Sequence, residues 1–139
     1  MTLLSRTSAV AVGGRALLIM GESGAGKSSL ALALIDRGAK LIGDDGVWLD
    51  RHGERIVASP PPNTAGLLEV RNLGLMAVPT EIDKRVALAI RLDPRAERYI
   101  EAAEQIELEG LQVPLIRLWP DSPVLALKVE LALERYGLA

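Results

Sequence analysis

The sequence predicts an α/β domain in which a phosphate-binding loop (P-loop) lies on a mixed, largely antiparallel sheet. Three observations support this fold class. A glycine-rich loop stands between an apolar run and a helix pattern, several strand patterns then follow one another without helices between them, and a second helix pattern closes the chain. A doubly wound fold would instead alternate strands and helices. We expect one domain over residues 1–139, with helices at the ends of the sheet.

The first elements are two apolar runs and a helix. Ser8–Val12 and Arg15–Met20 are joined by Gly13-Gly14, which predicts a β-hairpin whose second strand leads into the glycine-rich loop. Leucines and alanines at helical spacing predict a helix over Ser28–Arg37. Gly38 suits the left-handed position that ends many helices.

The rest of the chain predicts further strands and a closing helix. Polar residues at Arg51–Glu54 indicate a hairpin turn, Pro60–Asn63 indicates irregular backbone, and the charged stretch Pro94–Gln105 is ambiguous. Leucine-rich Pro123–Tyr136 predicts a helix that Asp121 or Ser122 caps and Gly137 follows. The strand patterns are Leu41–Asp44, Val47–Leu49, Arg55–Ala58, Leu67–Val70, Leu75–Val78, Val86–Leu92 and, within Gln105–Leu118, two strands joined near Glu109-Gly110.

Composition and charge exclude several classes of function. The net charge is -2, so no basic excess favours a nucleic-acid partner. There are no cysteines and one histidine, His52, which excludes thiolate catalysis and zinc sites built from cysteines or several histidines. We expect His52 to be exposed in its hairpin turn. No apolar run is long enough to cross a membrane, so we expect a cytoplasmic protein without a membrane partner.

The segment Gly21-Glu22-Ser23-Gly24-Ala25-Gly26-Lys27-Ser28 matches the pattern G-x-x-x-x-G-K-[ST] at every position. The glycines let the backbone curl so that its N–H groups converge on phosphate oxygens, and the following helix places its positive end at the same point. Lys27 supplies a cation, and Ser28 supplies a hydroxyl for Mg²⁺. We therefore predict that these residues hold the phosphate chain of a nucleotide.

Two acidic positions are candidates for chemistry beside this loop. Asp44 and Asp45 follow a predicted strand, and a P-loop enzyme needs an acid near the metal or the nucleophile, usually at a strand end. An Asp-Asp-Gly turn without a catalytic role explains the same residues equally well. Glu69 and Arg71 would face the same side of a strand, an arrangement that by itself is more typical of a surface ion pair.

Three segments together resemble the catalytic domain of the HPr kinase/phosphorylase family, in the short form that lacks the N-terminal domain. They are residues 17–32 around the loop, residues 35–45 ending in Asp44-Asp45, and residues 68–75, Leu-Glu-Val-Arg-Asn-Leu-Gly-Leu. The resemblance implies a fold like the nucleotide-binding part of phosphoenolpyruvate carboxykinase. It also implies phosphorylation of a serine of the phosphocarrier protein HPr by ATP and Mg²⁺, the reverse reaction with inorganic phosphate, and a hexameric homo-oligomer.

The same resemblance assigns roles to individual residues. Asp45 takes the serine proton and returns it in the reverse reaction, and Asp44 assists it. Lys27 stabilises phosphate charge, and Ser28 and Glu69 hold Mg²⁺. Arg71 matches an arginine that contacts phosphate or the partner, and Arg98 matches a further family arginine, for which Arg95 is the other candidate.

The sequence departs from the family pattern at three positions. The family usually has a histidine at Arg6, an acidic residue at Ser29 and a glycine at Asn72. The change at Arg6 bears most on the reverse reaction. These departures leave a second hypothesis open, a nucleotide-binding sensor module without chemistry. A third hypothesis is a small-molecule kinase with the same loop and a different acceptor.

Overall fold

The computed structural model describes residues 1–62 and 66–139 of the chain. Asn63, the last residue of the run expected to be irregular, lies outside the described residues, whereas Pro60–Pro62 have no helix or strand structure. The strands are β1 (Thr2–Ser5), β2 (Ser8–Val12), β3 (Arg15–Met20), β4 (Lys40–Gly43), β5 (Gly46–His52), β6 (Arg55–Ser59), β7 (Leu67–Val70), β8 (Gly74–Ala77), β9 (Lys84–Leu92), β10 (Glu104–Leu108) and β11 (Leu111–Leu118), and the helices are α1 (Lys27–Asp36) and α2 (Leu125–Tyr136).

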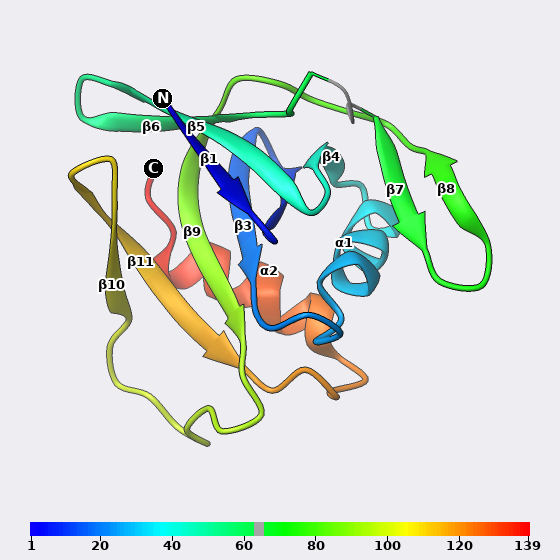
Figure 1. Ribbon diagram of the computed structural model, residues 1–139. Helices are drawn as coiled ribbons and strands as arrows, with labels where there is room; N and C mark the ends of the chain where they lie inside the picture. The colour runs from blue at the N-terminus through cyan, green and yellow to red at the C-terminus, as the bar shows by residue number, and fades with distance from the viewer. Residues whose placement is uncertain (63–65) are drawn as a thin grey trace.

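Nine of the strands form one mixed sheet (Figure 1). Its main path is β1-β5-β6-β9-β3-β2-β4, and β11 joins β9 and carries β10. The pairs β3–β9 and β9–β11 are parallel, and the other pairs are antiparallel. Strands β7 and β8 form a separate antiparallel hairpin beside α1. The predicted fold class, an α/β domain with a mixed and largely antiparallel sheet, is therefore confirmed.

Strand β9 is the centre of this sheet. Its first residues, Lys84 and Arg85, pair with β6, whereas its second half pairs with β11 from Ala89 to Leu92. Along its other edge it pairs with β3. The three parallel strands β3, β9 and β11 therefore end at one edge of the sheet. This is the edge at which the glycine-rich loop leaves β3, and it is the usual place for ligands in sheets with parallel strands.

Both faces of the central strands are buried. On one face, α1 and α2 pack against alternate residues of β3 and β9 such as Leu17 and Leu88. On the other face, Leu18 and Ala89 pack against side chains of β5, β6 and β11. We expected the helices at the ends of the sheet, and this was wrong because the spacing of helices along the chain does not fix the face that they cover. The buried helix residues on the first face are Leu30, Ala31, Leu34, Val129, Ala132 and Leu133.

Most expected elements are confirmed, with three differences. The hairpin of β2 and β3 has the predicted bounds, and the polar turn between β5 and β6 narrows to Gly53-Glu54. Strand β1 was not predicted, because it is a short, largely exposed strand that pairs only with the distant β5. The predicted cap of α2 was wrong: Val124 is at the N-cap without a side-chain hydrogen bond, and Ser122 instead accepts a hydrogen bond from the Val124 N–H in the turn before the helix.

The longest helix in the described residues is α2, with 12 residues, and none there has the length and apolar character needed to span a bilayer. The ambiguous stretch after β9 has no regular structure over residues 94–103. His52 is exposed, as expected, and lies 3.0 Å from the Asp50 carboxylate. Its hydrogen bond to that carboxylate lowers the pKa of Asp50.

Replacing Leu88 with alanine should lower the free energy of unfolding by about 2–5 kcal/mol. Leu88 is completely buried at the centre of β9, so its truncation leaves a cavity against both helices. Urea unfolding of the purified domain measures the loss. Leu131→Ala is the control, because Leu131 is 64% exposed on α2 and its loss should change stability by less than about 0.5 kcal/mol. Equal effects of the two substitutions would contradict this description of the core.

Candidate active site

The glycine-rich loop joins β3 to α1 in the conformation that its sequence requires. Gly24 and Gly26 have φ values of 82° and 104°, which residues with a Cβ rarely adopt. The Lys27 ammonium donates hydrogen bonds to the carbonyl oxygens of Gly21 (2.7 Å) and Glu22 (2.9 Å), so its charge lies across the loop. Helix α1 begins at Lys27 and places its positive end beside this cation. The loop therefore combines the backbone shape and the charge of an anion site.

Asp44 connects the loop to two other elements. Its Oδ1 accepts hydrogen bonds from the hydroxyls of Ser28 (2.7 Å) and Ser8 (2.9 Å). Its Oδ2 accepts a hydrogen bond from the backbone N–H of Glu69 (3.0 Å). One half-buried carboxylate thus holds together the start of α1, the start of β2 and the middle of β7. A turn without a role at the loop would not require these contacts.

Asp45 lies beside Asp44 in a tight turn, and its carboxylate takes no part in these three bonds. Its φ is 57°, a left-handed conformation that aspartate and asparagine tolerate better than most residues. Its carbonyl oxygen accepts a hydrogen bond from the backbone N–H of Arg6 (3.1 Å). The carboxylate of Asp45 is exposed and lines a cavity. The two neighbouring aspartates therefore differ: Asp44 holds the loop in place, whereas the Asp45 carboxylate is exposed in the cavity.

Replacing Gly43 with alanine should destabilise the domain by about 1–3 kcal/mol and displace Asp44. A Cβ at Gly43 would lie 2.3 Å from the Gly46 carbonyl oxygen, so the turn that carries both aspartates would have to open. Thermal unfolding measures the effect. Gly46→Ala at the other end of the turn is the matched control, since its Cβ would meet Pro61 at an ordinary 3.5 Å. A Gly43→Ala variant as stable as Gly46→Ala would contradict the tight turn.

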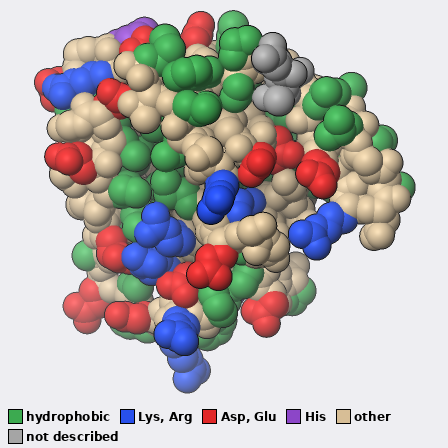
Figure 2. All heavy atoms as spheres, viewed as in Figure 1, with side chains coloured by type: hydrophobic (Ala, Val, Ile, Leu, Met, Phe, Trp, Pro, Cys, Tyr) green, Lys and Arg blue, Asp and Glu red, His purple; other side chains and the backbone are tan. Residues whose placement is uncertain are grey.

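The first cavity at this site, here called the aspartate cavity, has a volume of about 740 Å³. It brings together most of the residues singled out from the sequence, from three distant parts of the chain. Basic and acidic side chains also gather on this face of the molecule, over the region where β3 turns into α1 (Figure 2). The lining residues are Arg6, Ser23, Gly24, Gly26, Lys27, Ser28, Ser29, Leu32, Asp45, Glu69, Val70, Arg71 and Asn72.

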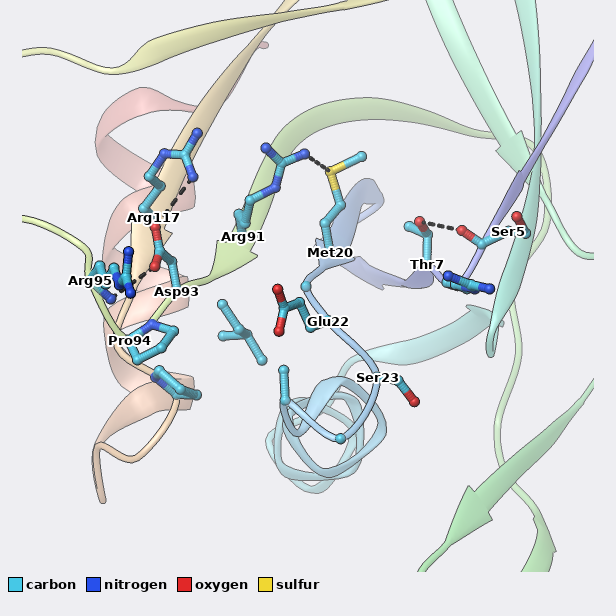
Figure 3. A pocket seen from close by; sticks show the side chains of 16 residues that line it. Ser5, Thr7, Met20, Glu22, Ser23, Arg91, Asp93, Pro94, Arg95 and Arg117 are labelled. Atoms are coloured by element: carbon cyan, nitrogen blue, oxygen red, sulfur yellow. Dashed lines mark hydrogen bonds and ion pairs between the residues drawn. The ribbon is translucent and has the colours of Figure 1, made fainter.

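A second cavity of about 1070 Å³, here called the arginine cavity, lies on the other side of the loop. Figure 3 shows Arg91 and Arg117 side by side on neighbouring strands above Glu22 of the loop, and the two arginines are partners in the β9–β11 register. Three residues, Arg6, Ser23 and Gly24, line both cavities. The remaining lining residues are Ser5, Thr7, Met20, Gly21, Ala25, Leu92, Asp93, Pro94, Arg95 and Pro120.

Comparison with known proteins shows the family of this chain. The family profile described as "HPr Serine kinase C-terminal domain" matches residues 4–118. The chain belongs to this family. The HPr kinase/phosphorylase of Cupriavidus necator is 37% identical over 117 residues, which are 76% of this chain and 36% of that protein. The protein of the same name from Clostridium tetani is 48% identical over 71 residues, which are 51% of this chain and 23% of that protein.

A solved structure shares the fold of this HPr kinase family member. It is described as "Structure of the Hpr(Ser) kinase/phosphatase from Coxiella burnetii", with a TM-score of 0.85 and 26% sequence identity. The match covers 96% of this chain and 89% of that chain. In contrast, the chain spans only 23% to 36% of the length of the two curated relatives above. The family resemblance predicted from the sequence is confirmed.

The structure separates the two candidates for a further family arginine. In the described part of the chain, Arg98 lines neither cavity, whereas Arg95 lines the arginine cavity. Arg117 donates hydrogen bonds to Glu104 (2.8 Å) and Asp93 (3.3 Å), and the bond to Glu104, more than that to Asp93, raises the pKa of Arg117. It therefore fastens the irregular segment after β9 to β11.

Sequence reasoning missed Ser8 and Arg91 in this family member. Ser8 is buried, and its hydroxyl fixes Asp44. The available signal was a serine at the start of an apolar strand. It was not sufficient, because Ser8 meets Asp44 only through the pairing of β2 with β4, which joins distant residues. Arg91 ends an apolar strand and, among the described residues, its guanidinium contacts only the sulfur of Met20 (3.7 Å).

The residues at the loop suit a magnesium ion better than a metal held by protein alone. Within the described residues, no group of three histidine, cysteine or acidic side chains could hold a metal. The aspartate cavity instead offers the hydroxyl of Ser28 and the carboxylate of Glu69. Magnesium commonly takes one or two protein oxygens and completes its shell with phosphate oxygens and water. The donor set therefore fits Mg²⁺ bound together with a nucleotide.

Proposed function

We propose that this domain transfers the γ-phosphate of ATP to a serine hydroxyl of the phosphocarrier protein HPr. The observation that carries the proposal is the hydrogen bond from Ser28 to Asp44, because it fixes the phosphate-binding loop beside the turn that presents Asp45. A phosphate donor on the loop and a base on the turn then share one cavity. Membership of the HPr kinase family supports the choice of acceptor.

Each residue of the site has its own role in phosphoryl transfer. The backbone of residues 21–28 and the ammonium of Lys27 bind and orient the phosphate chain, so most of the catalysis is positioning and charge stabilisation. Mg²⁺, when bound, would neutralise phosphate charge, and Ser28 and Glu69 are the residues that would hold it. Arg71 follows β7 on the wall of the same cavity and can contact either the phosphate or the acceptor.

Asp45 is the base of the proposed reaction. Its carboxylate is exposed in the cavity and, among the described residues, accepts no side-chain hydrogen bond, so it is available to take the serine proton. Asp44 is occupied by three donors and acts by holding Asp45 and the loop in place. In the reverse reaction Asp45 would return the proton. Arg98 was matched to a further family arginine but, in the described part of the chain, lines neither cavity, so Arg95 on the arginine cavity is the better candidate for that position.

The remaining expectations from the family stay part of the proposal. They are a homo-oligomer, hexameric in related proteins, a cytoplasmic location, and no nucleic-acid or membrane partner. The net charge of -2 supports the absence of a nucleic-acid partner.

The deciding experiment is transfer of labelled γ-phosphate from ATP to purified HPr in the presence of Mg²⁺. The proposal expects label on a serine of HPr, identified by mass spectrometry. Binding of Mg²⁺-ATP without transfer to HPr or to any metabolite in a lysate would instead support the sensor hypothesis. Transfer to a metabolite but not to HPr would support the small-molecule kinase.

A further inference from the structure

Arg6 occupies the junction of the two cavities. It is one of three residues that line both, and the other two, Ser23 and Gly24, belong to the loop itself. Arg6 therefore borders both cavities from a part of the chain outside the loop. Neither the predicted site residues nor the proposed reaction gives this cation a task.

The backbone of Arg6 is fixed to the turn that carries both aspartates. Its N–H donates to the carbonyl oxygen of Asp45, and its φ of 57° places it in a tight left-handed link between β1 and β2. The next two residues, Thr7 and Ser8, are 3% and 1% exposed, and the Ser8 hydroxyl binds Asp44. The backbones of Arg6 and Asp45 are therefore held at a fixed position relative to one another.

The guanidinium of Arg6 has no partner among the described residues. In the described part of the chain it makes no ion pair and no side-chain hydrogen bond, whereas Arg37 and Arg117 each pair with glutamate. An arginine side chain stays charged at any ordinary pH and binds phosphate through two parallel N–H groups. An unpaired arginine above a phosphate-binding loop is therefore a candidate for a phosphate contact.

We propose that Arg6 binds the terminal phosphate of ATP and neutralises its charge during transfer. The inference rests on the proposed function, in which the γ-phosphate passes from the loop toward the serine that Asp45 deprotonates. That path crosses the aspartate cavity, which both Arg6 and Asp45 line. A cation at this point stabilises negative charge on the transferring group.

This assignment predicts a difference between two nucleotides. ATP carries the phosphate that Arg6 contacts, and ADP does not. Loss of the guanidinium should therefore weaken Mg²⁺-ATP binding about tenfold, as for one lost hydrogen bond to a charged group, and change Mg²⁺-ADP binding by less than about twofold. A role in folding the turn would instead affect both nucleotides equally.

Calorimetric titration of Arg6→Asn with each nucleotide, without acceptor, tests the proposal. Asparagine suits the left-handed backbone and removes the guanidinium, which makes no bond within the described residues, so the melting temperature should not fall. Arg6→Lys should recover part of the ATP affinity. Arg55→Asn is the matched control, because Arg55 is an exposed arginine at the start of β6 that lines neither cavity.

Two outcomes would overturn the proposal: equal losses of ATP and ADP affinity in Arg6→Asn, or unchanged ATP affinity in that variant. Failure of the wild-type domain to phosphorylate HPr is a separate result. It would remove the proposed acceptor reaction, while the comparison of ATP with ADP would still report whether Arg6 contacts the terminal phosphate.

Discussion

Replacing Asp45 with asparagine should lower phosphoryl transfer to HPr by about 10²–10⁴-fold, the usual contribution of a general base. Asparagine cannot accept the serine proton, but it has nearly the same shape and tolerates the φ of 57° at this position. Asp45 forms none of the three bonds that hold the loop, because those belong to Asp44. Affinity for Mg²⁺-ATP should therefore change by less than about threefold.

The measurement compares initial transfer rates with ATP affinity for the same protein. Asp83→Asn is a close control, since Asp83 also has a left-handed φ, of 55°, and lies outside both cavities. It should transfer phosphate at the wild-type rate. Undiminished transfer by the Asp45→Asn variant would remove Asp45 as the base, and a parallel loss of ATP binding would show that it holds the nucleotide instead.

Replacing Lys27 with methionine should weaken binding and slow transfer together. The ammonium lies across the loop, 2.7 Å from the Gly21 carbonyl oxygen, where it is positioned to bind phosphate oxygens. Loss of one charged hydrogen-bond donor should reduce Mg²⁺-ATP affinity about 10- to 100-fold. Transfer at saturating ATP should fall about 10²–10³-fold, because the same charge stabilises the transferring group.

Titration with ATP and single-turnover transfer separate these two effects. Lys40→Met is the control, because Lys40 pairs with Glu81 at 3.7 Å, away from both cavities, and should leave binding and transfer unchanged. A Lys27→Met variant that binds ATP normally would show that the lysine acts only on the transition state. Normal transfer by that variant would contradict the assignment of the loop.

Local features of this fold could be predicted from the sequence because neighbouring residues determine them. The hairpin of β2 and β3 follows from two apolar runs around Gly13-Gly14, and its bounds were correct. The loop and α1 follow from glycine, lysine and the spacing of leucines. The same local signals identified Lys27, Ser28 and the aspartate turn.

Features that join distant residues could not be predicted in this way. Strand β1 forms only because β5 offers an edge more than 40 positions later in the chain, at Gly46–Leu49. The bond between Ser28 and Asp44 depends on the packing of α1 against the sheet, and spacing left the role of the aspartates open. Arg6 stood out in the sequence only as a departure from the histidine usual in the family, and its place between the two cavities depends on packing that spacing does not show.

The branched pairing of β9 determines the order in which this domain can fold. During synthesis, β3 and the loop emerge first, but the parallel partner of β3 begins only at Val86. Until that strand leaves the ribosome, the apolar edge of β3 has no neighbour on one side, and contacts of such long sequence separation form slowly. Strand β9 then joins β3 to β6, and β11 adds to β9 later, so the sheet edge that carries the phosphate-binding loop is completed only when most of the chain has been made.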